Sequence, residues 1–175
     1  MTDRPERPDR GSAWPVAGLD PIRRLRIVES QLPGVGATER LIDAPFERVW
    51  SFVADIERSV PAFDPLVARV EVRDREPVDG GERLSILTWG RGLPVPLPLD
   101  MRLEDGLCLM QGRGRWIRAG WFVVGMAARP VGDRTLFRHV EGTGLPGTRR
   151  LRRLFERTSR QDVDGIERAL ARGGG

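Results

Sequence analysis

The chain has 175 residues and a formal net charge of +4, a length that fits one domain with a substantial core. All 29 basic residues are Arg, and Lys and Tyr are both absent, which excludes a Schiff-base lysine and a phenolic general acid. The single cysteine, Cys108, excludes an intramolecular disulfide and a multi-cysteine metal site. It agrees with a reducing compartment, and no stretch approaches the roughly 20 apolar residues that span a bilayer. We therefore expect a cytoplasmic protein.

The N-terminal part of the chain differs from the rest in composition. Residues 1–18 are rich in Pro, Arg, Asp and Gly and offer almost no apolar side chain to bury, so we expect a disordered tail. Residues 19–34 form an N-terminal extension in which Asp20 and Pro21 are typical of an N-cap and a first helical position. A helix is therefore predicted from about residue 21 to residue 31.

A strand, a short helix and a further helical turn are predicted between residues 35 and 65. The strand should run from about residue 35 to residue 42. Pro45 suits the first turn of a helix, because that turn does not use the missing N–H, and Pro61 and Pro65 limit the second helical segment. The first helix has one apolar face, with residues at i, i+3, i+4 and i+7: Phe46, Val49, Trp50 and Val53.

This stretch carries a family resemblance. The run IDAPFERVWSFVADIERSVPAFDPLVARVEV resembles the opening of the SRPBCC or START-like superfamily, and within it the polyketide cyclase/dehydrase or coenzyme-Q-binding-like branch. The resemblance covers residues 37–172 and implies a helix-grip fold, whose members hold apolar ligands between a curved sheet and a long helix. The matching positions are Ile42, Asp43, Ala44, Pro45, Val49, Trp50, Asp55, Pro61, Phe63 and Pro65.

Further strands are predicted by the alternation of apolar and polar residues. They cover about residues 66–76, 82–89, 97–103, 107–113, 116–129 and 135–142. A final helix is predicted over residues 148–172. Its apolar stripe comprises Leu151, Leu154, Phe155, Thr158, Val163, Ile166 and Leu170.

The order of these elements predicts an α+β fold. Two short helices follow the first strand, and a curved antiparallel sheet of about seven strands wraps around the long C-terminal helix. This helix is the only element long enough to cover one face of the sheet. The START-like domain should span residues 35–172.

A cavity between sheet and helix would be lined by large apolar residues at inward-facing strand positions. The same residues could instead fill a solid core, since Met and aromatic side chains are ordinary packing residues. The inward face of residues 116–129 stays open, because both faces of that segment are apolar. The predicted ligand-binding residues are Phe63, Trp89, Met101, Met110, Arg113, Trp121, Phe122, Met126 and Phe137.

The only histidine, His139, is the main candidate for chemistry. It shares a strand face with Glu141, and a neutral imidazole beside a carboxylate could serve enolisation, aldol closure or dehydration of a polyketide-like substrate. Asp100 is a second carboxylate candidate. The alternative is a structural or surface histidine, because the apolar neighbours of Arg138 leave the buried face of this strand undecided. Cys108 has no nearby base in the pattern and is interpreted as a small buried residue.

Three functions are compatible with this pattern. The first is binding of a hydrophobic small molecule, such as a lipid, a quinone or a polyketide. The second is a polyketide cyclase or dehydratase reaction that uses His139 with a carboxylate. The third is a protein-interaction module. No cofactor or metal is expected, and no nucleic-acid-binding motif is present.

The start of the last helix is strongly basic. Cations near a helix N-terminus oppose the macrodipole, so these residues indicate either pairing with acidic strand faces or peripheral contact with an anionic surface. No pattern in the sequence defines an oligomeric state. The residues concerned are Arg149, Arg150, Arg152 and Arg153.

Overall fold

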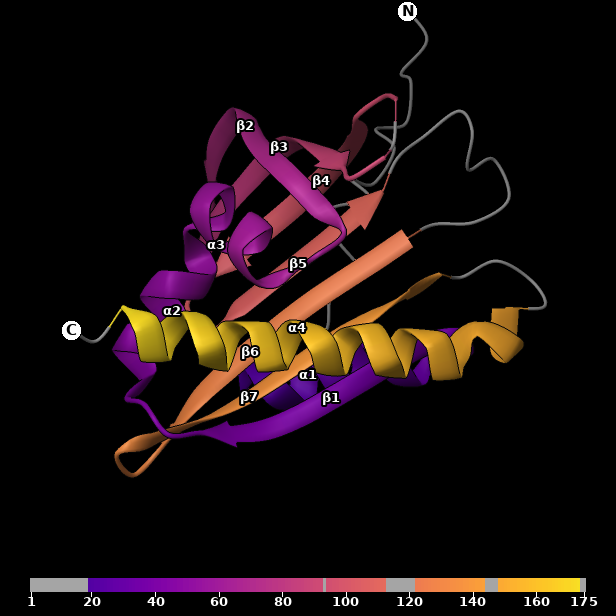
Figure 1. Ribbon diagram of the computed structural model, residues 1–175. Coiled ribbons are helices and arrows are strands. Elements are labelled where there is room, and N and C mark those ends of the chain that lie inside the picture. The colour runs from indigo at the N-terminus through magenta and orange to yellow at the C-terminus, as the bar shows by residue number, and fades with distance from the viewer. Residues whose placement is uncertain (1–18, 93, 113–121, 144–147, 174–175) are drawn as a thin grey trace, which may run out of the picture.

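One antiparallel sheet of seven strands, in the order β1-β7-β6-β5-β4-β3-β2, forms the framework of the protein. It is seen in a computed structural model that describes residues 19–92, 94–112, 122–143 and 148–173 (Figure 1). The two edge strands are far apart in the sheet although β2 follows β1 along the chain. The strands are β1 (Val35–Ile42), β2 (Val67–Val78), β3 (Gly81–Gly90), β4 (Leu97–Glu104), β5 (Leu107–Gly112), β6 (Phe122–Val131) and β7 (Arg134–Thr143).

Helices cover both faces of the sheet. In Figure 1, α4 runs in front of the sheet and α1 lies behind it. The helices are α1 (Pro21–Ser30), α2 (Phe46–Ala54), α3 (Ile56–Phe63) and α4 (Arg152–Arg172), which a short 3-10 helix, η1 (Thr148–Leu151), precedes. The predicted α+β fold, with seven strands, two short helices after the first strand and a long C-terminal helix, is therefore confirmed.

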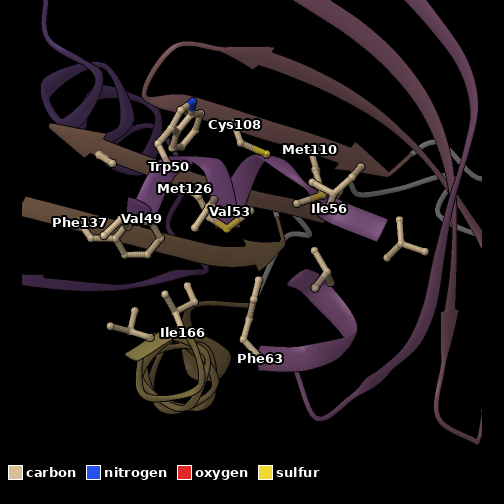
Figure 2. Packing of buried hydrophobic residues seen from close by; sticks show 14 of the residues in the cluster. Val49, Trp50, Val53, Ile56, Phe63, Cys108, Met110, Met126, Phe137 and Ile166 are labelled. Carbon is tan, nitrogen blue, oxygen red and sulfur yellow. The ribbon is translucent and has the colours of Figure 1, made fainter. Parts of the chain in front are cut away.

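The short helices form where the sequence pattern places them. Pro45 is the N-cap of α2, and Val49, Trp50 and Val53 are buried on one face of that helix. The next helix, α3, contains Pro61 and ends at Phe63, where Asp64 is extended, because the residue before a proline, here Pro65, is disfavoured in the helical region. Figure 2 shows the core that these helices close, with Ile166 pointing from α4 toward the strands that carry Met126 and Phe137.

The concave face of the sheet is covered unevenly. α4 packs on β1 and β7, while α3 packs on β2 and on α4. A helix with its side chains is about 10–12 Å wide and strands lie about 4.8 Å apart, so α4 covers only part of the face. The middle strands β3, β4 and β5 therefore contribute the part of the concave face that no helix covers directly.

The convex face has its own apolar cluster beneath α1. Ile22 and Leu25 of α1 are buried against Leu109, Val123 and Val140 of the sheet. Asp20 caps this helix, since its side chain accepts hydrogen bonds from the N–H groups of residues 22 and 23. Strands β5, β6 and β7 are thus buried on both faces, which explains why their sequences do not alternate clearly between apolar and polar residues.

Arg138 lies on this convex face and is half-buried. Its guanidinium pairs with Glu29 of α1 and with Glu39 of β1, the latter at 2.7 Å. Since neighbouring strand residues point to opposite faces, His139 must point to the concave face under α4. The sequence alone did not show whether Arg138 or His139 faces the core. The structure shows that Arg138 is accommodated on the convex face by its two acidic partners, Glu29 and Glu39.

Some predictions fall outside the described residues. The predicted tail, residues 1–18, is among them, as is the first part of the strand predicted over residues 116–129. In the last helix, the apolar stripe is shorter than predicted, because Leu151 and Leu154 are exposed. None of the helices in the described ranges is long and apolar enough to cross a membrane.

Gly165 allows α4 to approach α3 closely. A Cβ atom at this position would lie 2.9 Å from the Cα atom of Phe63 and 3.0 Å from its carbonyl carbon. Because these are backbone atoms, they cannot rotate away from the added methyl group.

Gly165→Ala is expected to lower the free energy of unfolding by about 1–3 kcal/mol, although Ala normally favours a helix interior by about 1 kcal/mol over Gly. Urea denaturation measures the change. Gly173→Ala is the matched control, since a Cβ atom there meets only the carbonyl oxygen of Ala169 at 3.6 Å. Equal stability of the two variants would contradict the close contact between α3 and α4.

Candidate functional site

A cavity of about 240 Å³ lies between the concave face of the sheet and the helices α3 and α4. Strands β2 to β7 and both helices contribute to its lining. The cavity occupies the region that α4 is too narrow to cover. Most of its lining is apolar and includes Ile56, Val60, Phe63, Val67, Val70, Ile86, Leu99, Met110, Phe122 and Val124.

The cavity has an exposed side and a buried side. Leu66 and Leu97 line it and are themselves exposed, at 59% and 38% of their surface. His139 and Asp162 line it as well, and both are buried. A molecule entering past the two leucines would therefore reach His139 and Asp162 at the buried end.

His139 is held in place by α4. Its side chain is 1% exposed, and its Nδ1 atom lies 3.0 Å from Oγ of Ser159. The Ser159 hydroxyl also donates to the backbone carbonyl of His139 at 3.2 Å. Burial lowers the pKa of His139 from its ordinary 6.5 to about 4, so the imidazole is neutral at physiological pH.

Asp162 faces His139 across a gap. Its Oδ2 atom lies 3.9 Å from Nε2 of His139, which is too far for a hydrogen bond. Burial raises the pKa of Asp162 from 3.8 to about 9, and the charges of Asp64 and Glu141 add to this shift. Although the two side chains could form an ion pair, burial favours the neutral imidazole and the protonated carboxyl, because the cost of desolvating two charges exceeds their attraction at this distance.

Two further carboxyl groups line the cavity. Glu141 accepts a hydrogen bond from the Thr158 hydroxyl at 2.7 Å, and burial raises its pKa from 4.5 to about 7. Asp64 accepts from the N–H of Leu66 at 2.7 Å, and burial raises its pKa too. Among the described residues, no group of three or more His, Cys, Asp or Glu side chains is arranged to hold a metal ion.

Five of the predicted site residues line the cavity. They are Phe63, Met110, Phe122, His139 and Glu141. Three others, Met101, Met126 and Phe137, lie on the same face of the sheet but are buried in the core beside the cavity. The roles of the five residues in binding or catalysis stay predictions.

Two predicted residues lie on the wrong face. Thr88 and Leu99 line the cavity, so their strand neighbours Trp89 and Asp100 point to the convex face. There the guanidinium of Arg69 stacks over the Trp89 ring, with its central carbon 3.9 Å from the ring centroid. Size and aromatic character favour the inward face of a strand, but here a cation–π contact covers the ring on the convex face. Arg113 and Trp121 lie outside the described residues.

Besides Thr88 of β3, the sequence pattern missed four polar residues at the site. Asp64 follows α3, and Thr158, Ser159 and Asp162 belong to α4. Ser159 and Asp162 were detectable in principle, because they stand at helical spacing with the buried Val163 and Ile166 and so share the inward face of α4. A polar residue inside an apolar stripe was the signal.

Cys108 and the basic run of the last helix lie apart from the cavity. Cys108 is fully buried in the core, and burial raises the pKa of its thiol, which makes it unreactive as a nucleophile. Arg150, Arg152 and Arg153 are exposed, and Arg152 pairs with Glu156 one helical turn away at 2.9 Å. The side chain of Arg149 lies outside the described residues. Contact of this run with an anionic surface stays a prediction.

Solved structures show what the fold is similar to. No family model matches the chain, and no curated protein matches it. TTHA0849 from Thermus thermophilus matches with 18% identity and a TM-score of 0.61, over 81% of this chain and 99% of that one. A START superfamily protein from Mycobacterium smegmatis matches with 14% identity and a TM-score of 0.59, over 79% of this chain and 97% of that one. The fold is START-like.

A third match is the Zhui aromatase/cyclase from a Streptomyces species. Its identity is 14% and its TM-score is 0.58, over 81% of this chain and 98% of that one. The resemblance predicted from residues 37–172 is thereby confirmed for the fold. Identities this low carry no information about the ligand or the reaction, because one fold hosts many functions.

The shifted carboxyl groups predict an unusual pH dependence of stability. Between pH 6.5 and about 9, the imidazole of His139 is neutral in the folded chain, whereas in the unfolded chain it goes from half protonated at pH 6.5 to neutral as the pH rises. Asp162 keeps its proton only in the folded chain over this range, and Glu141 does so up to about pH 7. The folded state therefore binds more protons, and the free energy of unfolding falls as the pH rises, by up to about 1.4 kcal/mol per pH unit for each carboxyl group that keeps its proton.

Asp162→Asn is expected to remove most of this decline, because the amide has no proton to lose. Urea denaturation at pH 6.5, 7.5 and 8.5 measures the slope, and Asp133→Asn, at an exposed turn residue, is the control that should keep it. Below pH 6.5 the slope should shrink, since the unfolded chain then gains a proton at His139 that the folded chain lacks. A flat profile above pH 6.5 in the unmodified protein would contradict the assignment.

Proposed function

We propose that the protein binds an uncharged, compact, apolar small molecule in the cavity between the sheet and α4. The observation that supports this most directly is the cavity itself, with apolar walls from the five strands β2 to β6 and from α3, and with polar side chains from β7 and α4. Ligand sites of proteins commonly combine mostly apolar walls with a few placed polar groups.

The size of the cavity favours a small ligand. Its volume of about 240 Å³ is slightly below the roughly 300–1,000 Å³ of common ligand pockets. Among the hydrophobic molecules that the sequence pattern indicates, a quinone ring or a small polyketide-like aromatic therefore fits this volume better than a long-chain lipid.

The charges around the cavity argue against an anionic ligand. Asp64, Glu141 and Asp162 all line it, while the described lining contains no arginine. A buried carboxylate ligand would lose its hydration and would face like charges without a cationic partner. A free fatty acid anion is therefore a poor candidate, and a neutral ligand is favoured.

Catalysis is a second candidate function. The observation that favours it is the neutral imidazole of His139 beside three carboxyl groups with raised pKa values, since shifted pKa values are common at active sites. His139 with Glu141 would then act as the acid/base pair of a cyclisation or dehydration. The similarity to an aromatase/cyclase adds only that the fold can carry such a reaction. Asp100 points away from the cavity and takes no part in this proposal.

Neutral two-ring ligands are expected to stabilise the protein against heat. Naphthalene and 1,4-naphthoquinone should raise the Tm, and at a hundredfold excess over Kd the gain is about 2.7 kcal/mol. The anion 2-naphthoate, which has the same ring system, should leave the Tm unchanged because of the three carboxyl groups. Differential scanning calorimetry measures the shifts.

A pair of variants locates the binding. Val124 lines the cavity from β6, and Val131 is exposed on the same strand. Val124→Phe should fill the cavity and abolish the shift in Tm, while Val131→Phe should keep it. Equal responses of the two variants, or no response of the unmodified protein to either neutral compound, would refute the proposal.

A further inference from the structure

Two polar atoms at the buried end of the cavity face each other without a hydrogen bond. Nε2 of His139 and Oδ2 of Asp162 lie 3.9 Å apart. Among the described residues, neither atom has a hydrogen-bond partner, although His139 is only 1% exposed and Asp162 only 5%. Buried polar groups are nearly always hydrogen-bonded. These two atoms are therefore able to form hydrogen bonds with a ligand.

The hydrogen bonds of Ser159 favour one of the two tautomers of the neutral imidazole. The Ser159 hydroxyl has one proton, and it donates to the backbone carbonyl of His139, which can only accept. Its oxygen then accepts from Nδ1 of the His139 ring at 3.0 Å. A neutral imidazole with its proton on Nδ1 has a free lone pair on Nε2. His139 therefore presents a hydrogen-bond acceptor to the cavity.

Asp162 presents a hydrogen-bond donor to the cavity. Its carboxyl group lines the same cavity as Glu141 of β7 and Asp64 after α3. This environment keeps the carboxyl protonated at neutral pH, and a protonated carboxyl has an O–H group that can donate. An acceptor and a donor thus face each other at the end of an apolar cavity.

We propose that His139 and Asp162 together bind a hydroxyl group of the ligand, which donates to Nε2 of His139 and accepts from the carboxyl of Asp162. An oxygen atom can lie about 2.8 Å from both ends of a 3.9 Å gap, so one hydroxyl satisfies both groups. The inference rests on the proposed function and narrows it, because it assigns the ligand to the phenols or alcohols with an apolar body. Asp162 is then a specificity-determining residue.

Equilibrium dialysis of naphthalene and 2-naphthol against the full chain tests this assignment. The two compounds differ by a single hydroxyl group. Each is measured on the unmodified protein and on Asp162→Leu, which keeps a side chain of similar shape without a donor. For each protein, the affinity for 2-naphthol is divided by the affinity for naphthalene. Because both proteins are measured with the same two compounds, the difference in their solubility in water cancels when the two ratios are compared.

The ratio of the affinity for 2-naphthol to that for naphthalene should be at least about ten times larger in the unmodified protein than in Asp162→Leu. This is the effect expected for the loss of a hydrogen bond at a buried site. Asp162→Asn should keep the preference, since its amide still donates. If Asp162→Leu does not fold, Asp162→Val, which also lacks a donor, takes its place.

The outcomes separate the two proposals. If both compounds bind and the preference is the same within about twofold in the unmodified protein and in Asp162→Leu, the hydroxyl site is refuted while apolar binding stands. A water molecule held permanently between the two groups would give that result. If neither compound binds to the unmodified protein, the proposed function is refuted and the hydroxyl site with it.

Discussion

The width of an α-helix is the constraint on which the rest of this structure depends. A helix with its side chains is about 10–12 Å across, whereas seven strands form a sheet roughly 29 Å wide. α4 can therefore cover only β1 and β7 closely, and α3 covers β2 at the other edge. The concave face between these contacts remains open, and the cavity lies there. The space is a consequence of covering a wide curved sheet with too few helices.

The dry environment of this space determines its chemistry. Burial shifts His139 and Asp162 toward their neutral forms, and the contact between His139 and Ser159 holds the ring against α4. The same burial that destabilises charge makes neutral donors and acceptors effective, because water does not compete for them. A compact neutral ligand and a hydroxyl site both follow from this environment.

Much of the fold could be predicted from local patterns, and less of the site could. Pro45 and the spacing of Val49, Trp50 and Val53 define α2 without any tertiary information. It was harder to predict which strand residues face the cavity. α1 covers the convex face, so β5, β6 and β7 carry apolar side chains on both faces. Trp89 was misplaced for a different reason, because a large aromatic side chain lies on the convex face, where Arg69 stacks on it. Asp162 was missed because burial of an acid on a helix is uncommon and becomes meaningful only when His139 is seen opposite it.

The central claim is that His139 faces the cavity as a neutral hydrogen-bond acceptor. Because it is the only histidine in the chain, its ring gives a single set of signals in a long-range ¹H–¹⁵N correlation spectrum. The account predicts one neutral form down to about pH 5, with the proton on Nδ1 and a lone pair on Nε2. A ring that titrates near its ordinary pKa of 6.5, or that carries its proton on Nε2, would contradict the account.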